Sequence, residues 1–179
     1  MALRATIFKS VLSVSDLDRH YYAEHALTLA RHPSETDERM MVRVLAFALF
    51  ADERLEFGRG LSSEDEPALW LRDYGGEIRL WIEVGLPDER VLRKASGRAE
   101  RVVLLAYGGR AAEVWWQNQR AALARLDNLT VLAVPQEASR GLAAMAERGM
   151  QLQVTVQDGE LWFSSADSAV QVSFERLKD

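Results

Sequence analysis

Cysteine is missing from all 179 residues of the chain. Without thiols the protein forms neither disulfides nor thiolate metal sites, and a reducing cytoplasmic setting is the expected one. Long apolar runs are missing too, since none approaches the roughly 18 residues that span a bilayer. Arg4 and Lys9 interrupt the apolar start MALRATIFKSVLSV, which argues against a signal peptide. We therefore expect a soluble, cytoplasmic protein with no membrane partner.

Lysine is scarce, with 3 residues against 19 arginines, and the net charge is −5. Proteins that coat duplex DNA by charge alone are usually basic, because phosphate contacts supply most of their non-specific affinity. General binding of nucleic acid is therefore not expected, although the net charge leaves room for a local groove rich in arginine. The apolar fraction of 48% and the chain length are typical of one globular domain, which we expect to cover residues 1–179.

Hydrophobic periodicity predicts a mixed α/β fold. The expected strands cover Ala5–Val14, Ala68–Asp73, Glu77–Val84, Arg101–Tyr107, Leu129–Val134, Leu152–Gln157, Leu161–Phe163 and Val170–Leu177. The expected helices cover Tyr22–Arg31, Glu35–Ala51, a segment that starts at Pro87, Ala111–Leu126 and Gln136–Arg148. The alternation of strands and helices in the second half predicts a parallel centre to the sheet. Antiparallel strands follow, and a turn at Asp158-Gly159 joins the first two of them. Phe57–Asp65 has the glycine and serine content of a loop.

The helix expected over Glu35–Ala51 is apolar almost all round in its stretch MMVRVLAFALF. Such a helix is expected to be buried. Ser34 is the expected N-cap, with Asp37 three residues later in a position like that of a capping box.

The turn Tyr74-Gly75-Gly76 joins two expected strands into a hairpin. A two-residue turn places Ala68 opposite Glu83 and Trp70 opposite Trp81. Glu66, one step beyond Ala68 on the same face, then lies diagonal to Glu83 at about 7–8 Å.

Two carboxylates at that separation can share one divalent ion that prefers oxygen, Mg²⁺ or Mn²⁺. The same register points Asp65 to the opposite face, whereas a longer turn would exchange the roles of Asp65 and Glu66. Lys94 and Arg98 lie at the margin of the apolar stripe of the next helix, from which Lys94 could reach toward Glu83 and polarise a phosphate.

Glu38 is a further candidate, because Met41 and Leu45 follow it at helical spacing and tilt it toward the interior. A carboxylate there is costly unless it is paired or binds a metal. The plain alternative for all these groups is a solvated carboxylate or a surface ion pair.

Several phrases resemble the YaeQ family of bacterial proteins: LARHPSETDERMM, ADERLEFGRGL, DEPALWLRD, LWIEVGLPDERVLRKASGRA, WWQNQ and VQDGELWFS. The resemblance runs from the first expected strand to the last. It implies a fold similar to the PD-(D/E)XK nuclease superfamily, a restriction-endonuclease-like core in which helices flank a mixed central sheet. Sites of that superfamily bind Mg²⁺ and cut phosphodiesters.

The superfamily pattern carries over with departures. Its acidic residue on the first core helix corresponds to Glu38, and its proline-aspartate pair to Glu66-Pro67, with the order reversed. Its (D/E)XK triplet falls on Glu83-Val84-Gly85, where the lysine is absent and Lys94 is the candidate substitute. A recurring accessory glutamine corresponds to Gln117.

Two functions remain open at this point. In the first, Glu66 and Glu83 hold Mg²⁺, Glu38 supports it, and Lys94 stabilises the transition state of a phosphodiesterase that acts on nucleic acid. In the second, a non-catalytic module keeps the fold and binds a protein or nucleic-acid partner. The missing triplet lysine and the negative charge favour the second function, and the clustering of Glu66, Glu83 and Lys94 favours the first.

Overall fold

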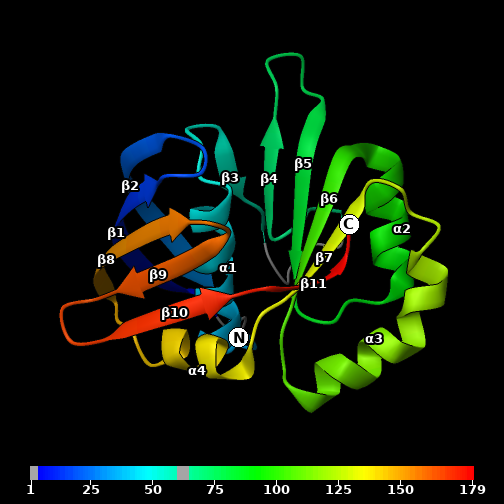
Figure 1. Cartoon of the computed structure of the whole chain (residues 1–179). Coiled ribbons are helices and arrows are strands. Elements are labelled where there is room, and N and C mark those ends of the chain that lie inside the picture. The colour runs from blue at the N-terminus through cyan, green and yellow to red at the C-terminus, as the bar shows by residue number, and fades with distance from the viewer. Residues whose placement is uncertain (1–3, 60–64) are drawn as a thin grey trace. The chain divides into compact units, whose positions relative to one another are not determined.

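The computed structural model describes residues 4–59 and 65–179. Contacts group the chain into two compact units, each built from two segments. Unit 1 comprises Met1–Ala51 and Glu137–Phe174, and unit 2 comprises Asp52–Gln136 and Glu175–Asp179. Each contains a mixed sheet together with helices, which confirms the mixed α/β class (Figure 1). The single domain expected over residues 1–179 stays a prediction.

Unit 1 is built on a five-stranded sheet of order β10-β9-β8-β1-β2 (Figure 1). Its strands are β1 Thr6–Asp16, β2 Tyr21–Arg31, β8 Gly149–Gln157, β9 Glu160–Ser164 and β10 Ala169–Ser173. β1 and β8 are parallel, and the other neighbours are antiparallel. Asp158 and Gly159 both have positive φ, 53° and 76°, so the expected tight turn between β8 and β9 is confirmed.

The helix expected over Tyr22–Arg31 is wrong, because this segment is strand β2. All its residues pair with β1 in an antiparallel ladder. Leu27 and Leu29 are buried, whereas their neighbours Ala26, Thr28 and Ala30 are exposed. This period of two was present in the sequence, but alanine, leucine and glutamate favour helix locally, and pairing with β1 overrides that preference.

Helix α1 (Asp37–Leu49) is buried from Met40 to Ala48, which confirms the expected buried helix. Its N-cap is Thr36, whose Oγ1 accepts a hydrogen bond from Arg39 N at 3.1 Å, so the expected Ser34 cap is wrong. A turn delays the start of the helix, because Ser34 N donates to the ring Nδ1 of His32 at 3.1 Å.

Unit 2 is built on a six-stranded sheet of order β11-β7-β6-β5-β4-β3. Its strands are β3 Leu55–Phe57, β4 Leu69–Arg72, β5 Ile78–Val84, β6 Ala99–Ala106, β7 Leu129–Ala133 and β11 Glu175–Lys178. β5, β6 and β7 form the expected parallel centre, with antiparallel neighbours on both sides. β3 was not expected, and most of the loop predicted over Phe57–Asp65 lies outside the described residues.

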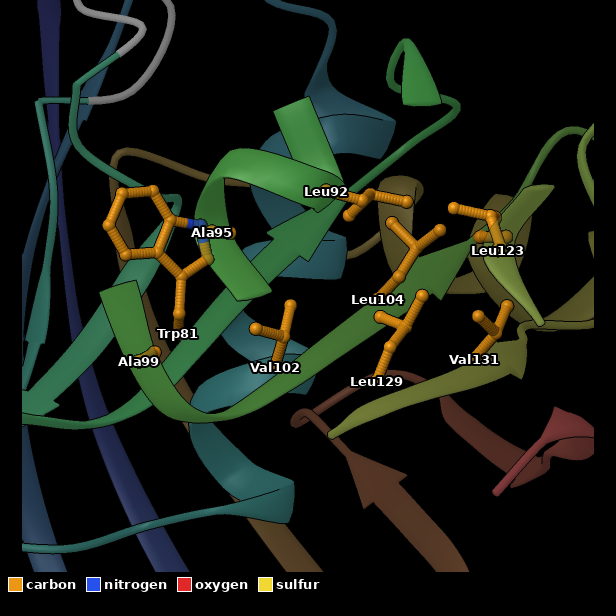
Figure 2. Packing of buried hydrophobic residues seen from close by; sticks show 10 residues of the cluster. Trp81, Leu92, Ala95, Ala99, Val102, Leu104, Leu123, Leu129 and Val131 are labelled. Atoms are coloured by element: carbon orange, nitrogen blue, oxygen red, sulfur yellow. The ribbon is translucent and has the colours of Figure 1, made fainter. Parts of the chain in front are cut away.

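One face of this sheet packs on α2 (Glu89–Arg98) and α3 (Arg110–Leu123). Figure 2 shows Trp81 of β5 with its indole beside Ala95 of α2. Leu104 of β6 and Val131 of β7 belong to the same buried cluster, together with Leu123 of α3. This packing fixes α2 over the end of the β4–β5 hairpin that carries Glu83.

The strand expected over Val170–Leu177 is two strands in different sheets. β10 pairs with β9 in unit 1, and β11 pairs with β7 in unit 2. The two segments are separated only by Phe174, so the sequence pattern alone does not reveal a change of partner. Helix α4 (Gln136–Ala143) also ends earlier than expected. None of the described helices is long and apolar enough to cross a membrane.

Candidate functional site

The β4–β5 hairpin sets the direction in which Glu83 points. Trp70 pairs with Trp81, so the register expected for the hairpin is confirmed. The turn is longer than two residues, since Asp73 N donates to Glu77 O at 2.9 Å, and an irregularity in the ladder restores the register. Trp81 and Glu83, two residues apart on one strand, face the same side of the sheet, which is the side of α2.

Trp81 holds the Glu83 carboxylate in place. The indole Nε1 of Trp81 donates to Glu83 Oε1 at 2.9 Å, and Trp81 itself is buried. Trp70 meets the Trp81 ring edge to face, with centroids 5.9 Å apart. The guanidinium carbon of Arg98 lies 5.0 Å from the centre of the same ring. Glu83 is therefore a half-buried carboxylate whose orientation depends on a buried tryptophan.

Helix α2 carries three exposed cations at a spacing of four residues, Arg90, Lys94 and Arg98. Residues at this spacing lie on one face of a helix, so the three form what we call the α2 ridge. A cavity of about 150 Å³ lies beside it, lined in part by Trp81, Arg90 and Lys94. Arg90 was not among the expected site residues, although its position four residues before Lys94 was visible in the sequence.

Asp65 is held by the α2 ridge. Lys94 Nζ donates to Asp65 Oδ1 at 3.0 Å, and Arg98 Nη1 donates to the backbone oxygen of Asp65 at 3.0 Å. The expectation that Asp65 points away from this face is therefore wrong. Strand alternation does not reach it, because β4 begins only at Leu69 and residues 65–66 lie in a turn.

Lys94 lowers the pKa of Asp65, first through its hydrogen bond and then through its charge, so that the pKa lies below the ordinary value of 3.8. A lowered carboxyl pKa means that the contact stabilises the fold above pH 3.8 and is lost as the pH falls through the shifted pKa. In an NMR titration of the Asp65 carboxyl we expect a midpoint below 3.8, and Lys94→Met should raise it toward the ordinary value, with Arg98 still lowering the pKa by its charge. Equal midpoints in the two proteins would contradict this assignment.

Glu66 closes the base of the loop between β3 and β4. Its Oε2 accepts a hydrogen bond from Arg59 N at 3.1 Å and lies 3.4 Å from Arg59 Nε. Gly58 N donates to Ala68 O at 2.9 Å, and a Cβ on Gly58 would come within 2.0 Å of Pro67 O. Glu66 thus has a structural partner, and its expected diagonal contact with Glu83 stays a prediction.

Glu38 belongs to unit 1, whereas Glu66, Glu83 and Lys94 belong to unit 2. Ser139 of α4, a fully buried residue, donates its Oγ hydrogen to Glu38 Oε2 at 3.0 Å. This contact accounts for the half-buried position of the carboxylate by joining α1 to α4. A role for Glu38 in catalysis stays a prediction.

Gln117 is exposed on α3 and lines a cavity of about 630 Å³ in unit 2. The cavity is also lined by Trp116 and by residues that follow β7, among them Pro135 and Gln136. Neither Glu83 nor Lys94 lines it. The accessory role expected for Gln117 stays a prediction.

The described residues do not meet the needs of a metal site held by three or more protein ligands. Within residues 4–59 and 65–179, no group of three or more histidines and carboxylates is placed to hold a metal ion. The described part of the chain therefore provides no closed cage for an ion. A site with only two protein carboxylates, Glu66 and Glu83, stays a prediction.

The chain is similar in sequence, over nearly its whole length, to a family model and to known proteins. A family model described as "YaeQ protein" matches residues 1–174. The "Uncharacterized protein YaeQ" of Salmonella typhi is 52% identical over 172 residues, which cover 96% of this chain and 95% of that protein. The protein of the same description from Escherichia coli K12 is 49% identical over 173 residues, which cover 97% and 96%.

Two solved structures are similar in fold as well as sequence. The crystal structure of a YaeQ protein from Xanthomonas axonopodis pv. citri has a TM-score of 0.93 and 50% identity, covering 97% of this chain and 98% of that one. The YaeQ protein from Pseudomonas syringae has a TM-score of 0.94 and 40% identity, covering 98% and 97%. On both sequence and structure, the chain belongs to the YaeQ family.

Proposed function

We propose that the α2 ridge binds the phosphodiester backbone of nucleic acid and that Glu66 and Glu83 hold Mg²⁺ beside it for hydrolysis. The observation that carries this proposal is the ridge itself. Arg90 and Lys94 line a small cavity together with Trp81, the residue that orients Glu83. Cations of this kind supply phosphate contacts even in a protein whose net charge is negative.

The ion pair between Lys94 and Asp65 can give way to a phosphate. Both side chains are largely exposed, 58% for Lys94 and 79% for Asp65. Exposed pairs of this kind contribute at most about 1 kcal/mol. A phosphate oxygen can therefore replace the Asp65 carboxylate on Lys94 at little cost, and Arg98 can keep Asp65 in place through its backbone oxygen.

The two carboxylates fit a Mg²⁺ ion that completes its coordination with waters and with oxygens of the substrate phosphate. Mg²⁺ in proteins often takes one or two carboxylates, several waters and the oxygens of a phosphate. Glu83 offers a carboxylate oriented by an indole N–H, and Glu66 one oriented by a backbone N–H. When bound, the ion supplies charge neutralisation and a water of lowered pKa. The residues of the chain bind and orient the phosphodiester.

The fold proposed for this activity is the PD-(D/E)XK nuclease-like one. Support comes from the mixed sheet of unit 2, with parallel β5, β6 and β7 and with α2 and α3 packed on one face.

A second candidate, a nucleic-acid-binding module without catalysis, is favoured by one specific observation. Gly85 stands where the triplet lysine is expected, and its φ of +101° is a conformation that suits glycine. A lysine at that position would be strained. The ridge would then serve binding alone.

Cleavage of labelled single-stranded DNA, duplex DNA and RNA in Mg²⁺ separates the two candidates. For the enzyme, Glu83→Gln should lower the rate by at least about 100-fold, in the range seen on loss of an essential electrostatic group, while binding is retained. Arg93→Met is the matched control, because Arg93 pairs with Glu89 on the same helix and is not part of the α2 ridge.

Binding without cleavage by the wild type would select the non-catalytic module, provided that Lys94→Met weakens binding and Arg93→Met does not. Absence of both binding and cleavage would overturn both candidates. Equal cleavage by wild type and Glu83→Gln would remove Glu83 from the mechanism.

A further inference from the structure

The outward face of the unit 1 sheet carries a neutral groove formed by two adjoining depressions. The first, of about 360 Å³, lies around Trp162, and the second, of about 230 Å³, lies beside Ser13 and Gln151. Gln153 and Ser164 line both depressions, so the two are neighbours in this groove. We call it the β8–β10 groove. Its volume is in the range of about 300–1,000 Å³ that is usual for small-ligand sites.

Both helices of unit 1 pack on the other face of this sheet. Phe47 of α1 meets the ring of His25 edge to face, with centroids 5.0 Å apart. A Cβ on Gly141 of α4 would lie 2.7 Å from Val170 of β10. Alternation places the residues next to Val170 on the opposite side. The groove therefore lies on the face that α1 and α4 leave open.

The lining has no charge but is rich in groups that both donate and accept hydrogen bonds. Among the described residues, every polar side chain that lines either depression is a glutamine amide or a serine or threonine hydroxyl. Two carboxylates contact the lining residues without lining the groove themselves. Ser13 Oγ donates to Glu24 at 3.4 Å, and Gln171 Nε2 donates to Glu160 at 2.9 Å. A phosphate or another anion would meet carboxylates and no lining cation, so an anionic ligand is disfavoured.

Trp162 supplies a flat apolar platform within this polar set. Its side chain is 40% exposed, although it is a large hydrophobic group on a solvent-facing strand. It pairs with Thr155 on β8 and with Gln171 on β10, so a hydroxyl and an amide flank the indole on either side. A pyranose ring matches this arrangement, since its C–H face packs on an aromatic ring and its hydroxyls donate and accept around the rim.

We propose that the β8–β10 groove binds a neutral oligosaccharide, with Trp162 stacking on one sugar ring and Gln153, Thr155 and Gln171 bonding to its hydroxyls. The two depressions, joined at Gln153 and Ser164, hold adjacent sugars of one chain. This site is independent of the proposed phosphodiester site, because its residues belong to unit 1 and the α2 ridge belongs to unit 2.

Backbone amide NMR with maltohexaose, cellohexaose and chitohexaose as probes tests the proposal on the full chain. We expect at least one of these to shift the amides of β8, β9 and β10. Trp162→Ala should weaken its affinity about tenfold, and Trp162→Phe should retain most of it, because a phenyl ring still stacks. Tyr74→Ala is the matched control, an aromatic that is 96% exposed in unit 2, and it should bind like wild type.

Several outcomes would overturn the proposal. One is the absence of shifts with all three neutral hexasaccharides. Another is equal affinity of wild type and Trp162→Ala while circular dichroism shows both folded. Stronger binding of dextran sulfate, or of an uncharged extended peptide, at the same amides would assign the groove to a different class of ligand.

Discussion

Glu35→Ala is expected to lower the free energy of unfolding by about 3–5 kcal/mol, the usual cost of leaving one member of a buried ion pair without its partner. Arg43 is buried in α1, and its Nε and Nη2 donate to the two carboxylate oxygens of Glu35 at 3.0 and 2.6 Å. Arg39 donates to the same carboxylate. Alanine at position 35 would therefore leave the Arg43 charge in the interior without its carboxylate. Urea unfolding measures the loss.

A double-mutant cycle gives this prediction its control. Glu35→Ala combined with Arg43→Met removes both charges, so the double variant should be more stable than Glu35→Ala alone. Glu89→Ala breaks an ordinary i,i+4 pair with Arg93 and should cost less than about 1 kcal/mol. A double variant no more stable than Glu35→Ala would show that the buried charge is not the cause.

Trp81→Ala is the second large effect, with an expected loss of about 3–5 kcal/mol from the cavity that it leaves. Trp81 is 2% exposed and belongs to the same buried cluster as Leu92, Ala95 and Val102, with its indole beside Ala95 of α2 (Figure 2). Trp81→Phe keeps much of this packing but removes the N–H that donates to Glu83. It should therefore cost less stability while still disturbing the Glu83 carboxylate.

Unfolding by denaturant, monitored by far-ultraviolet circular dichroism, compares the two variants. Trp162→Ala serves as the control, because its indole is partly exposed on the unit 1 sheet and should contribute little to the core. If Trp81→Ala and Trp162→Ala were equally stable, Trp81 would not be the packing centre that the cluster around it indicates. If Trp81→Phe left the orientation of the Glu83 carboxylate unchanged, the indole N–H of Trp81 would not be what orients it.

Local features of the fold were predictable from the sequence. The β4–β5 register was correct at Trp70 and Trp81, although the turn is longer than the expected two residues, because an irregularity in the ladder offsets the extra length. β2 was missed because its alanine, leucine and glutamate residues favour helix locally, and only pairing with β1 overrides that preference. The division of β10 from β11 depends on partners in two different sheets, and the pattern of residues 170–177 carries no sign of it.

The same contrast between local patterns and distant contacts explains which parts of the candidate site were predictable from the sequence. The elements that carry Glu83 and Lys94 were predictable, because each of the two residues lies on a regular strand or helix with a clear period. Asp65 was misplaced because it lies in a turn before β4, where strand alternation no longer applies. Arg43 was a missed signal of another kind, since one charge within MMVRVLAFALF must have a partner if the helix is buried.

Contact between the α2 ridge and phosphates is tested by the salt dependence of the affinity for nucleic acid. Fluorescence anisotropy with labelled single-stranded and duplex DNA, in EDTA so that no cleavage occurs, gives the slope of log affinity against log salt. Each lost phosphate contact should reduce that slope by about 0.7–0.9. We expect this reduction for Arg90→Met and for Lys94→Met, and the wild-type slope for Arg93→Met. Identical slopes in all four proteins, or no binding by the wild type, would show that the α2 ridge does not contact phosphates.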